Sequence, residues 1–228
     1  MRKRCAKEAF KLINNNSIIG LGGGLTISYL VSYIKESNLN VKIVTPSFST
    51  EKLCIENNLN VIPTWSADSI DIAFDGCDEV DLNLNALKSG GGIHTKEKII
   101  ASMAKEYVLL VDESKVSKRL TFEKPIVLEI LPESLSYVKR QVEALGGKVS
   151  MRHSSSKDGL TVSDNGLYLM DAYFDKNNIE NIEILNNKLR DIIGVLGSSL
   201  FYNIATRALV VSESGVRVIE NKESRKSL

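Results

Sequence analysis

Short apolar runs alternate with segments of helical periodicity along the first half of this chain, and this alternation constrains its fold most. Runs typical of buried strands lie at residues 17–21, 41–44, 61–62, 70–74 and 107–111. Apolar side chains at helical spacing lie before and between them, at residues 6–13, 27–34, 53–55 and 98–104. This order predicts an α/β fold with a Rossmann-like, doubly wound parallel sheet. Ligands of such sheets bind beyond the carboxyl ends of the strands.

A different pattern begins at Pro125 and predicts a second, smaller α+β domain. Its expected elements are a strand at 126–130, a helix at 132–145, a strand at 148–152, a polar turn at 154–158, an extended segment at 167–171 and a helix at 182–192. Strands at 208–211 and 216–219 should return to the first domain. We therefore expect a Rossmann-like domain of residues 1–124 plus 198–228, a small domain of residues 125–197, and a frayed tail at 221–228.

The overall charge argues against a nucleic-acid partner, because 29 Lys and Arg nearly balance 28 Asp and Glu among 228 residues. The cysteines at 5, 54 and 77 form no C-x-x-C pair, so neither a disulfide framework nor a zinc knuckle is expected. No apolar run approaches the ~20 residues of a membrane span, and charged residues interrupt the stretch that a signal peptide would need. These features predict a soluble, cytoplasmic protein.

A glycine-rich turn at residues 20–26 joins a predicted strand to a predicted helix, for which Thr26 is a plausible cap. Bare peptide N–H groups at a helix start bind anions. A dinucleotide site is disfavoured, because Leu25 stands where its fingerprint needs glycine and the next strand ends without an acid. No lysine follows the glycines, as a Walker motif would require. The turn is interpreted either as a single phosphate site, which we favour, or as a tight structural turn.

Four carboxylates follow the strand at 70–74, and their function is ambiguous from the sequence alone. They are Asp75, Asp78, Glu79 and Asp81. A Mg²⁺ or Ca²⁺ site is one interpretation, although the EF-hand spacing is absent. Recognition of sugar hydroxyls by ionised carboxylates is a second interpretation, and a solvated turn is the third.

The stretch from Lys88 to Glu97 is the most informative in the chain. A lysine, a run of glycines and an acid in the first turn of a helix can together hold a developing oxyanion, with Glu97 as the base. The helix dipole should lower the pKa of Glu97, so partial desolvation would be needed for a base near neutral pH. A helix cap with an exposed glutamate is the alternative.

Other polar residues are less distinctive. Lys115 follows a strand and could contact a phosphate or simply be an exposed lysine. His94 and His153 are expected at the surface or behind the site, and Cys77 is expected only to pack.

Taken in order, the motifs resemble those of the ribose-5-phosphate isomerase A family over nearly the whole chain. The matching stretches are residues 20–26, 49–52, 75–79, 88–92, 97–98, 112–115, 129–132, 145–147, 161–166 and 193–195. The resemblance implies an isomerase of ribose 5-phosphate and ribulose 5-phosphate that acts through an enediolate. It implies no metal or cofactor, and a homodimer or homotetramer.

The resemblance also implies roles for individual residues. Glu97 matches the general base, Asp75 and Asp78 match acids that bind the sugar and handle its hydroxyl protons, and Lys88 matches the cation of the oxyanion site. The substrate-binding set that follows comprises these two aspartates and Lys88 together with Gly23, Gly24, Leu25, Thr26, Gly76, Cys77, Ser89, Gly90, Gly91 and Lys115. The resemblance places both the turn from Gly23 to Thr26 and Lys115 near the phosphate.

Departures from the family pattern leave alternatives open. Gly23 and Leu25 replace residues that usually carry hydroxyls, and Ser89 and Ser199 replace expected glycines. A sugar-phosphate sensor without turnover is therefore the second hypothesis. A deaminase or acyl-CoA transferase on a related scaffold is the third. The lysine and the glutamate favour the isomerase, because a sensor has no need of them.

Overall fold

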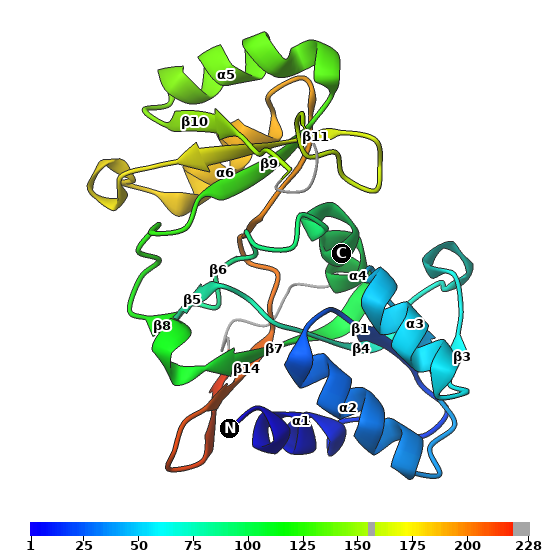
Figure 1. The fold of residues 1–228 in the computed structure, drawn as a ribbon. Coiled ribbons are helices and arrows are strands. Elements are labelled where there is room, and N and C mark those ends of the chain that lie inside the picture. Colours follow the sequence, from blue (N-terminus) through cyan, green and yellow to red (C-terminus); the bar gives the residue numbers. More distant parts are fainter. Residues whose placement is uncertain (155–157, 221–228) are drawn as a thin grey trace.

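The computed structural model describes residues 1–154 and 158–220, which form three β-sheets with helices packed against them (Figure 1). The helices are α1 (Arg2–Phe10), α2 (Leu25–Glu36), α3 (Phe48–Glu56), α4 (His94–Met103), α5 (Leu135–Ala144) and α6 (Ile182–Arg190). The strands are β1 (Ile18–Leu21), β2 (Lys42–Val44), β3 (Asn60–Val61), β4 (Ile70–Asp75), β5 (Glu79–Asp81), β6 (Ala86–Leu87), β7 (Ala104–Asp112), β8 (Val116–Ser117), β9 (Ile126–Ile130), β10 (Lys148–Met151), β11 (Tyr168–Tyr173), β12 (Val195–Ser198), β13 (Leu200–Phe201), β14 (Arg207–Val211) and β15 (Val216–Glu220).

The largest sheet has the strand order β15-β14-β7-β4-β1-β2-β3 and is parallel except for β15. Buried apolar side chains of α1, α2 and α3 pack on one face, and those of α4 pack on the other. This arrangement confirms the predicted doubly wound sheet. Because β4, β1 and β2 are neighbours, the turns that follow them meet at one edge of the sheet. The glycine-rich turn and the acidic turn therefore lie side by side.

Two predicted helix starts were wrong, and both lie near that edge. The second helix begins at Leu25 with Gly24 as its N-cap, so Thr26 lies inside the helix and does not cap it. Gly24 has φ +96°, a conformation that favours glycine over any capping side chain. The helix expected from residue 98 begins at His94, and Ala104 already belongs to the long strand β7. Glu97 is thereby confirmed in the first turn of a helix.

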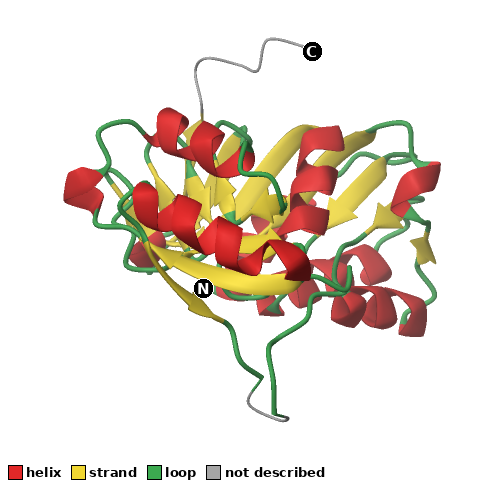
Figure 2. Ribbon diagram, turned by 90° about the horizontal axis from the view of Figure 1, so that it is seen from above, coloured by secondary structure: helices red, strands yellow, loops and turns green. Residues whose placement is uncertain are grey.

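The second sheet is antiparallel, with the order β10-β11-β9-β12, and it belongs to the smaller α+β part of the fold. The helices α5 and α6 cover one face through residues such as Val138 and Leu189. The other face carries Glu129 and Asp171 and lies toward the start of α4 (Figure 1). The described parts of the connection between β10 and β11, residues 152–154 and 158–167, extend away from the body of the molecule (Figure 2). The fourth strand, β12, was not expected from the sequence.

A third, small sheet with the order β13-β6-β5-β8 links the other two. Its strands are only two or three residues long, too short for alternation of polar and apolar residues to reveal them. No described helix is long and apolar enough to cross a membrane. The expected frayed tail at 221–228 and most of the expected polar turn at 154–158 lie outside the described residues.

Candidate active site

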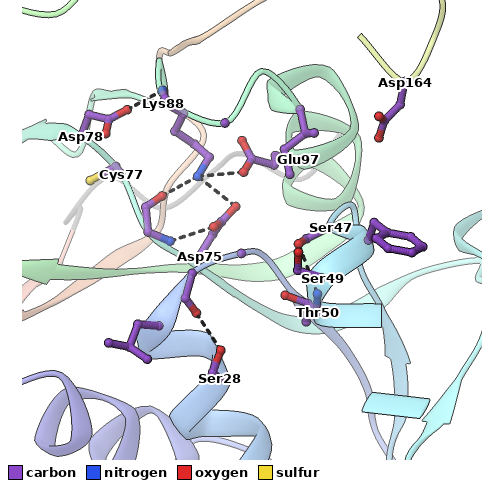
Figure 3. A pocket seen from close by; sticks show the side chains of 18 residues that line it. Ser28, Ser47, Ser49, Thr50, Asp75, Cys77, Asp78, Lys88, Glu97 and Asp164 are labelled. Atoms are coloured by element: carbon purple, nitrogen blue, oxygen red, sulfur yellow. Dashed lines mark hydrogen bonds and ion pairs between the residues drawn. The ribbon is translucent and has the colours of Figure 1, made fainter. Parts of the chain in front are cut away.

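A cavity of about 790 Å³ lies at the carboxyl ends of β1, β2 and β4 (Figure 3). Most of the residues predicted to bind substrate form its wall, together with the predicted base Glu97; they are Gly23, Gly24, Leu25, Asp75, Gly76, Cys77, Asp78, Lys88, Gly90 and Gly91. Three predicted residues are not on this wall, namely Thr26, Ser89 and Lys115. The fold thus gathers residues that are more than 70 positions apart into one pocket.

Asp75 is the last residue of β4, and its carboxylate is buried at the floor of the cavity. Gly22 makes this possible, because a Cβ at that position would lie 2.0 Å from Oδ1 of Asp75. Oδ1 accepts a hydrogen bond from the N–H of Gly76 at 2.8 Å, and Oδ2 accepts one from the hydroxyl of Tyr107 at 3.4 Å. The carboxylate is therefore fixed by its own turn and by β7.

Lys88 lies between two acids, as Figure 3 shows. Its Nζ is 2.9 Å from Oδ2 of Asp75 and 3.4 Å from Oε1 of Glu97, and it also donates to the carbonyl of Gly76. All three side chains are at least nine-tenths buried. The nearby acids outweigh the cost of burial and raise the pKa of Lys88, so it stays charged. The cluster therefore carries one cation for two carboxyl groups.

Glu97 does not have the lowered pKa that a helix start alone would predict. Burial, followed by repulsion from Asp75, raises its pKa to about 8, although Lys88 acts in the opposite direction. Glu97 is therefore desolvated, as a base near neutral pH requires, and burial raises its pKa by more than the helix dipole lowers it. A carboxyl group with this pKa can hold and release a proton near neutral pH.

Asp78 binds the loop of residues 88–92, called the glycine loop below, rather than standing free. Its Oδ2 accepts hydrogen bonds from the N–H of Ser89 at 2.7 Å and from that of Gly90 at 2.9 Å. Those two peptide groups are therefore occupied in this structure. The N–H of Gly91 is the next donor along the loop, and Gly91 lies on the cavity wall.

The N-terminus of α2 forms another part of the wall. No side chain caps this helix, so its first peptide N–H groups are available to an anion. The exposed Leu25 offers no hydroxyl there, whereas Ser28, one turn further on, lines the cavity. Lys115 donates to the carbonyl of Cys77 at 2.7 Å, which places its charge at the margin of the cavity.

The structure decides between alternatives that the sequence left open for nearby residues. His94 is fully buried and lies off the cavity wall rather than at the surface, and burial lowers its pKa to about 4. The acidic turn is not solvated: Glu79 accepts from Ser117 and Thr121, away from the cavity, and Asp81 is hydrogen-bonded within its own turn. The carboxylates diverge, and the described residues contain no group of three or more potential metal ligands.

Other residues on the wall were not assigned to the site from the sequence. They are Ser28, Ser47, Phe48, Ser49, Thr50, Ile93 and Asp164. The Ser/Thr-rich turn after β2 could have been found, because it follows a strand adjacent to β1. Ser47 caps α3 by accepting from the N–H of Thr50, which in turn donates its hydroxyl to Gly22. Asp164 comes from the β10–β11 connection and pairs with Lys96 at 3.2 Å.

The fold and the cavity define a class of protein: an α/β enzyme whose buried carboxyl–ammonium cluster lies beside an anion-binding helix end. A family model described as ribose 5-phosphate isomerase A (phosphoriboisomerase A) matches residues 42–215. Curated proteins named ribose-5-phosphate isomerase A from Methanothermobacter thermautotrophicus and Pyrococcus abyssi are each 34% identical to this chain, with 96% of it and 97% of each relative covered.

Solved structures agree with this match. A ribose 5-phosphate isomerase A from Methanocaldococcus jannaschii has a TM-score of 0.89 and 33% identity, covering 96% of this chain and 97% of its own. A D-ribose-5-phosphate isomerase in complex with phospho-erythronic acid gives the same values. The chain belongs to the ribose 5-phosphate isomerase A family.

Proposed function

We propose that this protein interconverts ribose 5-phosphate and ribulose 5-phosphate, with Glu97 as the base that moves a proton between C2 and C1. The protein is an aldose–ketose isomerase, in keeping with its family and with the full-length match to its relatives. The observation that supports the mechanism is the buried contact between Lys88 and Glu97 at 3.4 Å. A sensor would gain nothing from this costly arrangement, so the sensor hypothesis is not favoured.

The chemistry follows from the charges in the cavity. Ionised Glu97 removes the proton from C2 of the open-chain aldose, and the electron pair moves to the carbonyl oxygen at C1 as the enediolate forms. Glu97 becomes neutral as the substrate becomes negative, so the total charge of the cavity does not change. Lys88 and the N–H of Gly91 stabilise the new oxyanion without reorganising. The hydroxyl proton on O2 passes to O1, and Glu97 returns its proton to C1, which gives the ketose with its carbonyl at C2 and a hydroxyl at C1.

The two aspartates handle the hydroxyl groups of the sugar. Asp75 has one oxygen on the Lys88 ammonium and the other on its own turn, so it is oriented as an acceptor at the cavity floor. Asp78 holds the glycine loop while its side chain also faces the cavity. Both positions suit hydroxyl binding and proton transfer during ring opening.

The phosphate binds at the N-terminus of α2, where peptide N–H groups without a side-chain cap adjoin the cavity. Ser28 also lines the cavity, and its hydroxyl donates to the carbonyl of Gly24 at 3.3 Å. Lys115 contributes a positive charge from outside the cavity wall, where it donates to the carbonyl of Cys77. Binding energy from this remote group can be used to orient the reacting carbons. No metal or organic cofactor takes part in this proposal.

We also propose a cytoplasmic location and a homodimer or homotetramer. The three cysteines are buried and unpaired, as in a reducing environment. The edge strand β12 and the residues before it expose Ile193 and Leu196, which are 80% and 56% accessible and could be covered by a second copy. Light scattering coupled to gel filtration measures this directly, and a monomeric mass would contradict the proposed oligomer.

The isomerase mechanism is tested by the exchange of substrate hydrogen with solvent. The protein is incubated with ribose 5-phosphate in deuterium oxide with a metal chelator present, and the C1 and C2 positions are followed by NMR. Ketose formation with deuterium incorporation is expected, at an unchanged rate with and without chelator. Ketose formed without any incorporation would argue for direct hydride transfer, and no ketose at all would refute the proposed activity.

A further inference from the structure

The glycine loop of the cavity is held from two sides. Asp78 accepts the N–H groups of Ser89 and Gly90 from one side. From the other side, Arg152 donates Nη2 to the carbonyl of Ser89 at 3.0 Å and Nη1 to that of Gly90 at 3.4 Å. A flexible run of three glycines would otherwise have many conformations available.

The arginine is itself oriented before it reaches the loop. It follows β10 in the second sheet, and its Nη2 and Nε lie 2.6 and 3.3 Å from the two carboxylate oxygens of Asp171 on β11. Both side chains are largely buried, with 22% and 14% of their surfaces exposed. A paired guanidinium of this kind has a fixed plane, unlike a lysine ammonium.

Peptide planarity carries this constraint into the cavity. The carbonyl of one residue and the N–H of the next belong to one rigid plane and point in opposite directions. Fixing the carbonyl of Gly90 therefore fixes the N–H of Gly91 so that it points away from Arg152. Among the residues that the structure describes, none accepts a hydrogen bond from this N–H, and Gly91 lies on the cavity wall.

We propose that Arg152, oriented by Asp171, is a positioning residue for the isomerisation: it aims the N–H of Gly91 at the oxyanion of the enediolate. This inference rests on the proposed function, because it assigns the donor that the intermediate uses. Arg152 does not touch the substrate. It acts through the carbonyl groups of Ser89 and Gly90, so a residue that follows a strand of the second sheet orients a donor of the active site.

The test compares Arg152→Gln with Arg207→Gln. Arg207 is a matched control, because it is 27% exposed and pairs with Glu106 and Glu220 on the main sheet, outside the cavity. Arg152→Gln should lower kcat about 10- to 100-fold with KM changed less than about threefold, since misplacement of a group near the reacting atoms can cost that much. Arg207→Gln should leave both constants within about twofold of the original.

A second readout isolates the oxyanion site. Phospho-erythronic acid carries a carboxylate in place of the reacting carbons, so its inhibition constant should rise with Arg152→Gln by a factor similar to the fall in kcat/KM. Inhibition by inorganic phosphate, which needs only the helix end, should not change. Equal effects on both inhibitors, or effects no larger than those of Arg207→Gln, would overturn the proposal.

Asp171→Asn keeps the arginine but removes its orientation, and it decides the matter if Arg152→Gln does not fold. If both variants fold, a kcat of Asp171→Asn that lies between those of the original protein and of Arg152→Gln supports the proposal. If Arg152→Gln does not fold, a kcat of Asp171→Asn about 10-fold below that of the original protein supports it. An unchanged kcat refutes it. If the unaltered protein itself forms no ketose, the proposed function fails instead, so the two failures are distinguishable.

Discussion

The raised pKa of Glu97 predicts how activity depends on pH. Only ionised Glu97 can remove a proton from C2, and its pKa lies at about 8. About one tenth of the free enzyme is then active at pH 7 and about nine tenths at pH 9. We therefore expect kcat/KM to rise roughly tenfold over this interval. The second ionisation of a sugar phosphate has a pKa of about 6, so it can be told apart from the ionisation of Glu97 at about 8.

Replacing Asp75 shows whether the neighbouring charge sets this pKa. Oxygens of Asp75 and Glu97 lie 2.9 and 3.4 Å from the same Nζ, so these two oxygens are at most about 6 Å apart. At that distance and an effective dielectric constant of about 20, their repulsion is about 3 kcal/mol, or roughly two pH units. Asp75→Asn should move the rise in kcat/KM one to two units toward acid pH, although the maximum falls because Asp75 also binds the sugar.

The assay is the initial rate of ketose formation from pH 5.5 to 9.5 at constant ionic strength, with substrate well below KM. Thermal unfolding at each pH serves as the control for loss of folded protein. A profile for the original protein that is half-maximal below pH 6, or a shift toward alkaline pH in Asp75→Asn, would refute the reasoning. Either result would mean that Glu97 is not the group observed or that Lys88 dominates its environment.

Three further substitutions test other parts of the site. Glu97→Gln should lower kcat about 100- to 10,000-fold, and near-original turnover would remove Glu97 from the mechanism. Because folded Glu97 keeps its proton between pH 4.5 and about 8 while the unfolded chain loses it, Glu97→Gln should also gain thermal stability relative to the original as pH rises through that window, which scanning calorimetry can check. Gly22→Ala should lose about 1–3 kcal/mol of stability, and its kcat should fall at least tenfold, because the added Cβ would overlap the Asp75 carboxylate. Gly76→Ala is the control: its Cβ would point into open space, so its Tm should not change. Leu25→Ser should lower KM severalfold at constant kcat by adding a hydroxyl at the start of α2, and an unchanged KM would place the phosphate elsewhere.

The main sheet and the centre of the cavity could be predicted from the sequence because both depend on local patterns. Strand-length apolar runs identified β1, β4 and β7, and the known behaviour of parallel sheets placed the turns after them at one edge. Asp75 could be selected because it lies in such a turn, and Lys88 because it precedes a run of glycines and an acid at a helix start. Only the structure could show that the ammonium of Lys88 lies within 3.4 Å of carboxylate oxygens of both Asp75 and Glu97.

Residues contributed by long-range packing left no such local signal. Arg152 reaches the glycine loop from another sheet, more than 60 positions away, and nothing in the sequence around it distinguishes it from an exposed arginine. Tyr107 resembles any apolar strand residue, yet its hydroxyl reaches Asp75. The ring of the buried His94 contacts the carbonyl of Gly197 at 3.4 Å, and Gly197 belongs to a strand that the sequence did not reveal.

The charge of the buried cluster argues for function over stability. A single buried ion pair contributes little to folding, because desolvation offsets the attraction between its members. Here a third ionisable group, Glu97, shares the ammonium of Lys88 with Asp75, and its ionised form is the one that burial disfavours. A hydrophobic residue in its place would pack without that cost. The arrangement has a purpose if a proton must leave and return near neutral pH, because the same burial that disfavours the carboxylate makes it a strong base toward a sugar carbon. The protein therefore gives up stability at the position where its proposed chemistry requires a reactive carboxylate.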